Sequence, residues 1–234
     1  MFEFVSHPID GVIGVAIGRI VGEILIIVAT DGIAESIMEH LPQIANQVKN
    51  GGKVEKIVES IKASNGAAEA LTRKSVRLLD EVADVALLSR VKEIRGLLPS
   101  DLKRGGNFGI AKVEIQGIKN ELYAHSGIDV IADTRSAASN VSDIMLKPTN
   151  PIFKATSVPT NDGTMLFRDM DTEYKILNNI AEKLGDNTSI SGKIRLFTER
   201  PCCDSCNNVI LEFLEKYKNI SIEVVHNNGT LLRP

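Results

Sequence analysis

The cysteines of this chain are confined to one short stretch, and that stretch limits what the sequence can fold into. All 3 cysteines among the 234 residues lie at positions 202, 203 and 206, directly after Pro201. Cys203 and Cys206 stand three residues apart at the start of a predicted helix, so both project from one helix face and can hold one ion. The helix N-terminus also favours thiolate over thiol. The spacing alone leaves open a metal site, a redox pair or half of a zinc knuckle.

The residues around the cysteines predict helices and strands in alternation. Residues 171–184 carry apolar side chains at helical spacing, and residues 193–199 alternate as in a strand. The second helix begins at the cysteines, and residues 220–225 form a further predicted strand. Asp171 and Glu173 thus open one helix, while Cys203 opens the next. A ligand-x-Glu pattern followed by Cys-x-x-Cys at the next helix is the arrangement of zinc-dependent deaminases.

At these residues the chain resembles the toxin deaminases of the cytidine-deaminase-like superfamily, which form C-terminal parts of bacterial polymorphic toxins. The resemblance rests on residues 171–177, Thr198 and Glu199 before the cysteines, and Phe213 with the closing strand. Residues 110–118 and 124–126 are similar to the opening strands of such domains. The resemblance implies an α/β fold, a three-layer α/β/α deaminase-like sandwich, in which the superfamily's final helix and strand are short or missing.

The resemblance also implies an activity and a set of roles. The expected function is zinc-dependent hydrolytic deamination of a nucleobase, cytosine or adenine, in nucleic acid or a nucleotide. Asp171, Cys203 and Cys206 would hold Zn²⁺, and Glu173 would move the proton from water to the ring nitrogen and then to the leaving amine. The chain would be a bacterial toxin, secreted or delivered into target cells and active in their cytoplasm. A cognate immunity protein is implied as a partner.

The sequence departs from the superfamily pattern at two positions. Asp171 stands where the first ligand is commonly histidine, and Cys202 stands where proline commonly precedes the first cysteine. A carboxylate ligand makes the site one charge more negative, which should make a bound water less acidic unless a cation compensates. We consider three cations for that role, namely Arg168, Lys175 and Arg200. His125 is an alternative third ligand or a substrate contact.

Other interpretations of the same residues stay open. Glu173 could be a first-turn carboxylate favoured by the helix dipole, Asp171 a helix N-cap, and His125 a hydrogen-bonded strand-end histidine. The domain could then be a noncatalytic zinc-stabilised interaction domain, or a thiol-disulfide protein that uses Cys203 and Cys206. A net charge of −3 and the absence of tryptophan argue against a protein that coats nucleic acid nonspecifically.

The first part of the chain differs from the rest in its apolar, helical character. Residues 1–104 are expected to form a helical N-terminal region, serving delivery or acting as a pre-toxin segment, before a deaminase-like domain over residues 105–234. Residues 11–30 are a nearly continuous apolar run that predicts a buried helical hairpin or transient membrane contact. Helices are predicted over residues 33–49, 54–63 and 67–98. Residues 143–163, with three prolines, predict a long loop that rims the site.

Overall fold

The computed structural model of this protein describes residue 66 and residues 69–129, 143–160 and 162–234. Contacts divide the chain into two compact units, Met1–Ala68 and Glu69–Pro234, and the elements described here belong to the second. The predicted apolar run at 11–30 and the helices at 33–49 and 54–63 lie outside the described residues. Within the described part of the chain, no helix combines the length and the apolar character that a membrane span requires.

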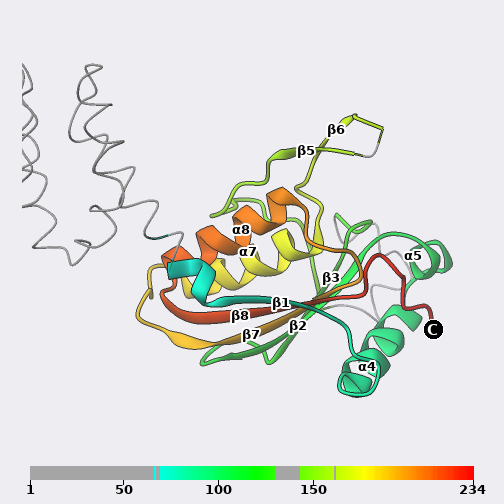
Figure 1. Cartoon of the computed structure of the whole chain (residues 1–234), viewed down its shortest axis with the longest axis horizontal. Coiled ribbons are helices and arrows are strands. Elements are labelled where there is room, and N and C mark those ends of the chain that lie inside the picture. Colours follow the sequence, from blue (N-terminus) through cyan, green and yellow to red (C-terminus); the bar gives the residue numbers. More distant parts are fainter. Residues whose placement is uncertain (1–65, 67–68, 130–142, 161) are drawn as a thin grey trace, which may run out of the picture. The chain divides into compact units, whose positions relative to one another are not determined.

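A six-stranded mixed sheet forms the centre of the unit (Figure 1), in the order β1-β8-β7-β2-β3-β4. β8 is parallel to both β1 and β7, whereas β2 is antiparallel to β7 and β3. A separate antiparallel pair is made by β5 and β6. The elements are β1 (Lys74–Leu78), α4 (Val85–Gly96), α5 (Ser100–Arg104), β2 (Phe108–Ile115), β3 (Glu121–His125), β4 (Ile144–Met145), β5 (Ser157–Pro159), β6 (Met165–Phe167), α7 (Thr172–Leu184), β7 (Ser191–Thr198), α8 (Asp204–Lys216) and β8 (Asn219–His226).

Helices α7 and α8 cover one face of the sheet. Their apolar stripes at helical spacing pack onto the inward-facing side chains of β2, β7 and β8, because such stripes are buried most fully against a flat apolar face. Phe213 of α8 and Tyr217, directly after the helix, are fully buried in this layer, so they are packing residues and do not offer a stacking surface to a base. This packing fixes where the two helices begin, and therefore where the cysteines lie.

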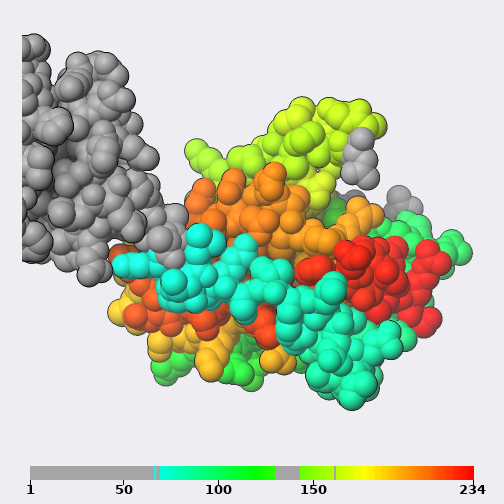
Figure 2. Space-filling model, in the orientation of Figure 1, coloured from blue at the N-terminus to red at the C-terminus, as the bar shows by residue number. Residues whose placement is uncertain are grey.

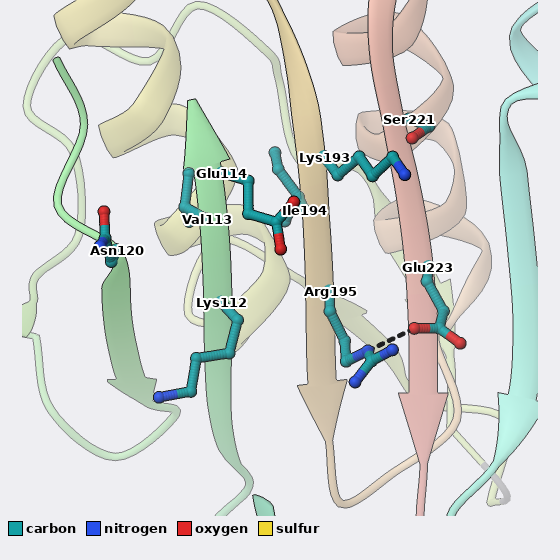
Figure 3. Close-up of a pocket in the computed structure, with 9 residues that line it drawn as sticks. All are labelled: Lys112, Val113, Glu114, Asn120, Lys193, Ile194, Arg195, Ser221 and Glu223. Carbon is teal, nitrogen blue, oxygen red and sulfur yellow. Dashed lines mark hydrogen bonds and ion pairs between the residues drawn. The ribbon is translucent and has the colours of Figure 1, made fainter. Parts of the chain in front are cut away.

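The opposite face is covered in part by α4, whose Val91 and Ile94 pack on Phe108 and Phe197 of the sheet. The rest of that face is polar because side chains alternate along a strand. It forms an open cavity of about 620 Å³ among Lys112, Lys193, Arg195 and their neighbours, in which Arg195 pairs with Glu223 (Figure 3). Helices on both faces confirm the predicted three-layer α/β/α arrangement.

The segment before β2 differs from the predicted helix over residues 67–98. Residues 69–72 are helical as predicted, but residues 74–78 form the strand β1, which pairs in register with residues 222–226 of β8, and the next helix is α4. The β-branched Val76 favours an edge strand over a solvent-exposed helix. Arg77 adds a side-chain bond to the neighbouring strand, because it donates to Glu223. Likewise, residues 143–163 contain β4 and β5 within the predicted loop.

A buried ion pair joins α4 to the end of β7. Arg95 Nη1 lies 3.0 Å from Glu199 Oε2, and both side chains are fully buried. Arg95 also donates to the carbonyl oxygens of Lys103, Gly105 and Gly106. The α4 and α5 segment, which the sequence assigns to the N-terminal region, is therefore bonded directly to the strand that precedes the cysteines.

Candidate active site

The N-termini of α7 and α8 meet at one point above the sheet. Asp171 is the N-cap residue of α7, but its side chain makes no capping hydrogen bond to the helix. The carboxylate is instead turned toward α8, where Asp171 Oδ2 lies 3.3 Å from Cys203 Sγ and 3.1 Å from Cys206 Sγ. Cys203 is the N-cap of α8, and its sulfur accepts from the N–H of Cys206. The N-cap position predicted for Asp171 is thus occupied without the predicted capping bond.

These three side chains fit a zinc ion. Their potential ligand atoms all lie within 4.8 Å of one another. Zinc binds sulfur at about 2.3 Å and carboxylate oxygen at about 2.0–2.2 Å, so the tetrahedral ligands of one ion stand about 3.3–3.8 Å apart. The observed separations require only small shifts to reach that spacing. Two helix N-termini also place partial positive charge beside the anionic ligands.

The two thiols of the group differ in acidity. The hydrogen bond from the Cys206 thiol, helped by the Cys206 N–H, lowers the pKa of Cys203 to about 7. The same bond to Cys203, together with burial, raises the pKa of Cys206. The protein alone therefore presents one sulfur close to thiolate and one firmly protonated. A metal ion would have to displace the Cys206 proton, which couples metal affinity to pH.

Arg168 supplies a positive charge beside the carboxylate. Its Nε donates to Asp171 Oδ2 at 2.8 Å, and both side chains are only partly exposed. The other two cations considered from the sequence lie differently. Lys175 is buried and its Nζ donates to the carbonyl oxygens of His125 and Ile128, whereas Arg200 is an exposed residue that lines the adjacent cavity. Of the three, Arg168 is the one in direct contact with Asp171.

Glu173 lies beside this group but is not part of it. Its side chain is 2% exposed, and its Oε2 accepts from the Thr172 hydroxyl at 2.9 Å. The thiol of Cys202 is 3.5 Å from Oε1, so the cysteine that the sequence left without a role contacts this carboxylate. Burial, and then the nearby charge of Asp171, raise the pKa of Glu173. The glutamate is held where it can take up and release a proton.

Asn107, which sequence reasoning missed, connects the first turn of α7 to β7. Its amide nitrogen donates to the hydroxyls of Thr172 and Thr198 at 3.0 and 2.8 Å, and its oxygen accepts from the Arg200 N–H. Gly109 allows the close approach that this contact needs, since a Cβ there would lie 2.8 Å from Thr172 Cβ. In the sequence, Asn107 follows two glycines and indicates only a turn.

His125 is not brought into the group. The ring is fully buried at the end of β3, and Nδ1 accepts from the Gly127 N–H at 2.9 Å. Nε2 then carries the proton and faces the Gly105 carbonyl oxygen at 2.9 Å. Burial is the main cause that lowers the pKa of His125 to about 4. Both ring nitrogens are used in hydrogen bonds, the arrangement expected of a hydrogen-bonded strand-end histidine.

A cavity of about 240 Å³ opens onto the group. Asp171, Glu173, Cys203 and Cys206 line it together. Its lining also includes the apolar residues Leu166, Phe167 and Met170 and polar residues, among them Asn107, Ser126 and Arg200. The rim thus includes β6, which follows the loop predicted over 143–163. An apolar lining with a few polar groups is typical of a small-molecule or base-binding site.

The comparison with known protein families agrees with this arrangement. A family model described as Toxin-deaminase, the BURPS668_1122 family of deaminases, matches residues 91–228, more than half of the chain. This stretch contains the sheet strands β2, β3, β4, β7 and β8, both site helices and the cavity-lining hairpin. No curated protein and no solved structure matches the chain significantly. The chain therefore belongs to the BURPS668_1122 family of deaminases, and with it to the deaminase toxins, hydrolases that act on C–N bonds.

Proposed function

We propose that this chain is a zinc-dependent hydrolytic deaminase of a nucleobase, cytosine or adenine. One observation carries the proposal. Asp171, Cys203 and Cys206 turn their ligand atoms toward one point, and buried Glu173 lines the same cavity without belonging to the ligand group. A deaminase needs separate groups for two tasks: two or more anionic ligands that bind the metal, and a further carboxylate that transfers protons.

The residues would share the reaction as follows. Asp171, Cys203 and Cys206 hold the ion, which when bound supplies the Lewis acidity that makes a water molecule nucleophilic near neutral pH. Glu173 would accept one proton of that water and donate it to the ring nitrogen, where it stays, and would then carry the second proton of the same water to the amine, which leaves as ammonia. Arg168, in contact with Asp171, offsets the charge that a carboxylate adds to the ligand set.

The test measures zinc and base conversion in the same preparations. Reduced full-length protein is assayed for zinc per chain, and for uracil or inosine formed from nucleosides, single-stranded DNA, duplex DNA and RNA. Glu173→Gln should keep near-stoichiometric zinc and lose turnover by about 10²-fold or more, since proton transfer contributes about 10²–10⁴-fold. Glu182→Gln is the matched control on the exposed side of α7 and should change neither quantity.

Each alternative gives a different result in this experiment. Zinc without conversion on any substrate would favour a noncatalytic zinc-stabilised interaction domain. A metal-free protein whose Cys203 and Cys206 cycle between dithiol and disulfide would favour a thiol-disulfide protein. Full activity of Glu173→Gln would remove this residue from the reaction and contradict the proposed mechanism.

The third ligand can be tested separately. Asp171→Ala should lose zinc, because it removes the oxygen that both thiols face. His125→Gln should keep zinc, because both ring nitrogens already bond the backbone. Asp171→His should also retain zinc, since imidazole is a common zinc ligand. Zinc loss in His125→Gln but not in Asp171→Ala would reverse the assignment.

Membership in a toxin family supports a proposal about where the enzyme acts. We propose that the chain is secreted or delivered into target cells, deaminates its substrate in their cytoplasm and is neutralised by a cognate immunity protein in the producer. Residues 1–104 would contain the delivery segment. Cytoplasmic expression of the wild-type chain should then arrest growth, while Glu173→Gln expressed to the same level should not. Equal toxicity of both would show that growth arrest does not come from deamination.

A further inference from the structure

The hairpin of β5 and β6 places apolar side chains in solvent beside the candidate active site. All three residues of β6 are strongly exposed, with Met165 at 59%, Leu166 at 47% and Phe167 at 53%. The hairpin pairs only with itself in a two-stranded sheet. It projects beyond α8 in Figure 1, and in Figure 2 it forms the yellow-green lobe of the surface. Three consecutive apolar side chains that are each about half exposed leave a large apolar area in solvent, which is typical of a surface that binds something.

The hairpin is continuous with the cavity that contains the proposed catalytic group. Leu166 and Phe167 line this cavity together with Asn107 and Arg200, while Met165 does not. The cavity measures about 240 Å³, below the 300 Å³ or so at which typical small-ligand pockets begin. A space of this size suits a single base. The sugar and phosphate of a nucleotide would have to lie outside, across the rim formed by the hairpin and Arg200.

Phe167 and Arg200 offer complementary contacts for a nucleotide chain. Phe167 presents an aromatic ring, on which any base can stack. Arg200 is exposed and lines the same cavity, and its guanidinium suits a phosphate oxygen. Phe167 is 53% exposed although it lines the cavity, so a free nucleoside whose base fills the cavity would leave part of the ring in solvent. A base that belongs to a polynucleotide brings neighbouring bases and phosphates to the rim.

We propose that the β5–β6 hairpin positions a polynucleotide substrate, with Phe167 stacking on a base next to the target and Arg200 contacting the adjoining phosphate. The inference rests on the proposed deaminase function and names its substrate class, a base within a nucleic-acid chain. Phe167 is a positioning residue in this scheme. It takes no part in proton transfer, so its removal changes how the chain binds and leaves the chemistry at the base intact.

The experiment compares three variants on two substrates, using full-length zinc-loaded protein. The substrates are a single-stranded oligonucleotide that contains the convertible base and the corresponding free nucleoside. Phe167→Ala should lower kcat/KM on the oligonucleotide by about 5- to 150-fold, the effect of removing one base–aromatic stack, mainly through KM. On the nucleoside, which has no neighbouring base to stack on the exposed part of the ring, the loss should be clearly smaller than on the oligonucleotide. Met165→Ala, on the same strand but outside the cavity, should leave both unchanged, and Phe167→Tyr should restore oligonucleotide activity.

Failure of this inference can be told apart from failure of the proposed function. If the wild type converts neither substrate, the deaminase proposal fails. If it converts both and Phe167→Ala matches it on the oligonucleotide while its melting temperature is unchanged, the hairpin does not position the substrate. A change from dimer to monomer in Phe167→Ala, with oligonucleotide kinetics unchanged, would assign the hairpin to self-association and would equally overturn the inference. If Phe167→Ala lowers the melting temperature, and Phe167→Tyr recovers that temperature without recovering oligonucleotide activity, then Phe167 is a folding residue and the inference fails.

Discussion

Replacing Arg95 by methionine should cost the protein a large part of its stability. Methionine keeps most of the side-chain volume but removes the guanidinium that pairs with Glu199. The buried carboxylate then retains only the N–H groups of Phe108 and Leu232 as donors. The carbonyl oxygens of Lys103 and Gly106 lose the Arg95 donor as well, while that of Gly105 keeps the N–H of His125.

The magnitude follows from what Glu199 does when its partner is gone. Burial already raises the pKa of Glu199, and Arg95 partly opposes this, so the variant should hold Glu199 protonated. Taking up that proton costs about 1.4 kcal/mol for each pH unit above the ordinary pKa of 4.5, hence at most about 3.5 kcal/mol at pH 7. With the unpaired carbonyls, the loss of unfolding free energy should be about 3–5 kcal/mol at pH 7.

The pH dependence has a definite sign. A carboxyl whose folded pKa is raised stabilises the fold at low pH and loses that contribution as pH rises above 4.5. The cost of Arg95→Met should therefore be smaller at pH 5 than at pH 7. Urea unfolding followed by circular dichroism, in reducing buffer with a chelator so that metal binding does not contribute, measures both values.

Arg90→Met provides the control on the same helix. Arg90 pairs with Glu121 but is itself 34% exposed, and exposed ion pairs are worth about 1 kcal/mol or less. Its replacement should therefore cost little and show no comparable pH dependence. A loss below about 1 kcal/mol for Arg95→Met, or an equal loss at both pH values, would refute the reasoning about the buried pair.

Three further predictions concern the rest of the unit. A chain of residues 105–234 should fail to fold, because it lacks β1, which pairs with β8, and α4, which covers part of one face of the sheet. A chain of residues 69–234 should remain soluble and helical by circular dichroism. Equal folding of the two chains would contradict this. Between pH 6.5 and pH 4 His125 should contribute a loss of about 3 kcal/mol of unfolding free energy, because its ring stays neutral until its pKa of about 4; the difference between the pH-stability curves of the wild type and His125→Gln measures this contribution, and parallel curves would contradict it. Gly109→Ala should weaken zinc binding in a competitive titration by displacing Thr172 between Asp171 and Glu173; unchanged affinity would show that the first turn of α7 can adapt.

The helices and strands that hold the site residues could be predicted, because the apolar spacing that indicates them is local in the sequence. The predicted helix at 171–184 and strand at 193–199 correspond to Thr172–Leu184 and Ser191–Thr198. The strand predicted at 220–225 is Asn219–His226. Apolar spacing of 3.6 or 2 residues fixes such elements within one or two positions. The order of the two helices around one strand then brings Asp171 and the cysteines to the same end of the sheet.

The features that could not be predicted from the sequence depend on contacts with residues far away in the chain. Nothing local distinguishes residues 74–78 from helix, because the pairing that makes them a strand involves residues 222–226. The role of Asn107 depends in the same way on Thr172 and Thr198. For His125, the sequence could not decide between ligand and packing residue, since only the fold shows what its two ring nitrogens face.

The position of β8 between β1 and β7 has a consequence for synthesis on the ribosome. β1 is made early, yet its neighbour in the sheet is β8, the last strand of the unit to be made. Until β8 leaves the exit tunnel, β1 has no neighbour in the sheet, and β7 has a partner on one side only. The cysteine helix lies just before β8 in the chain, so during synthesis the sheet beneath the proposed metal ligands stays incomplete until β8 has followed that helix out of the exit tunnel.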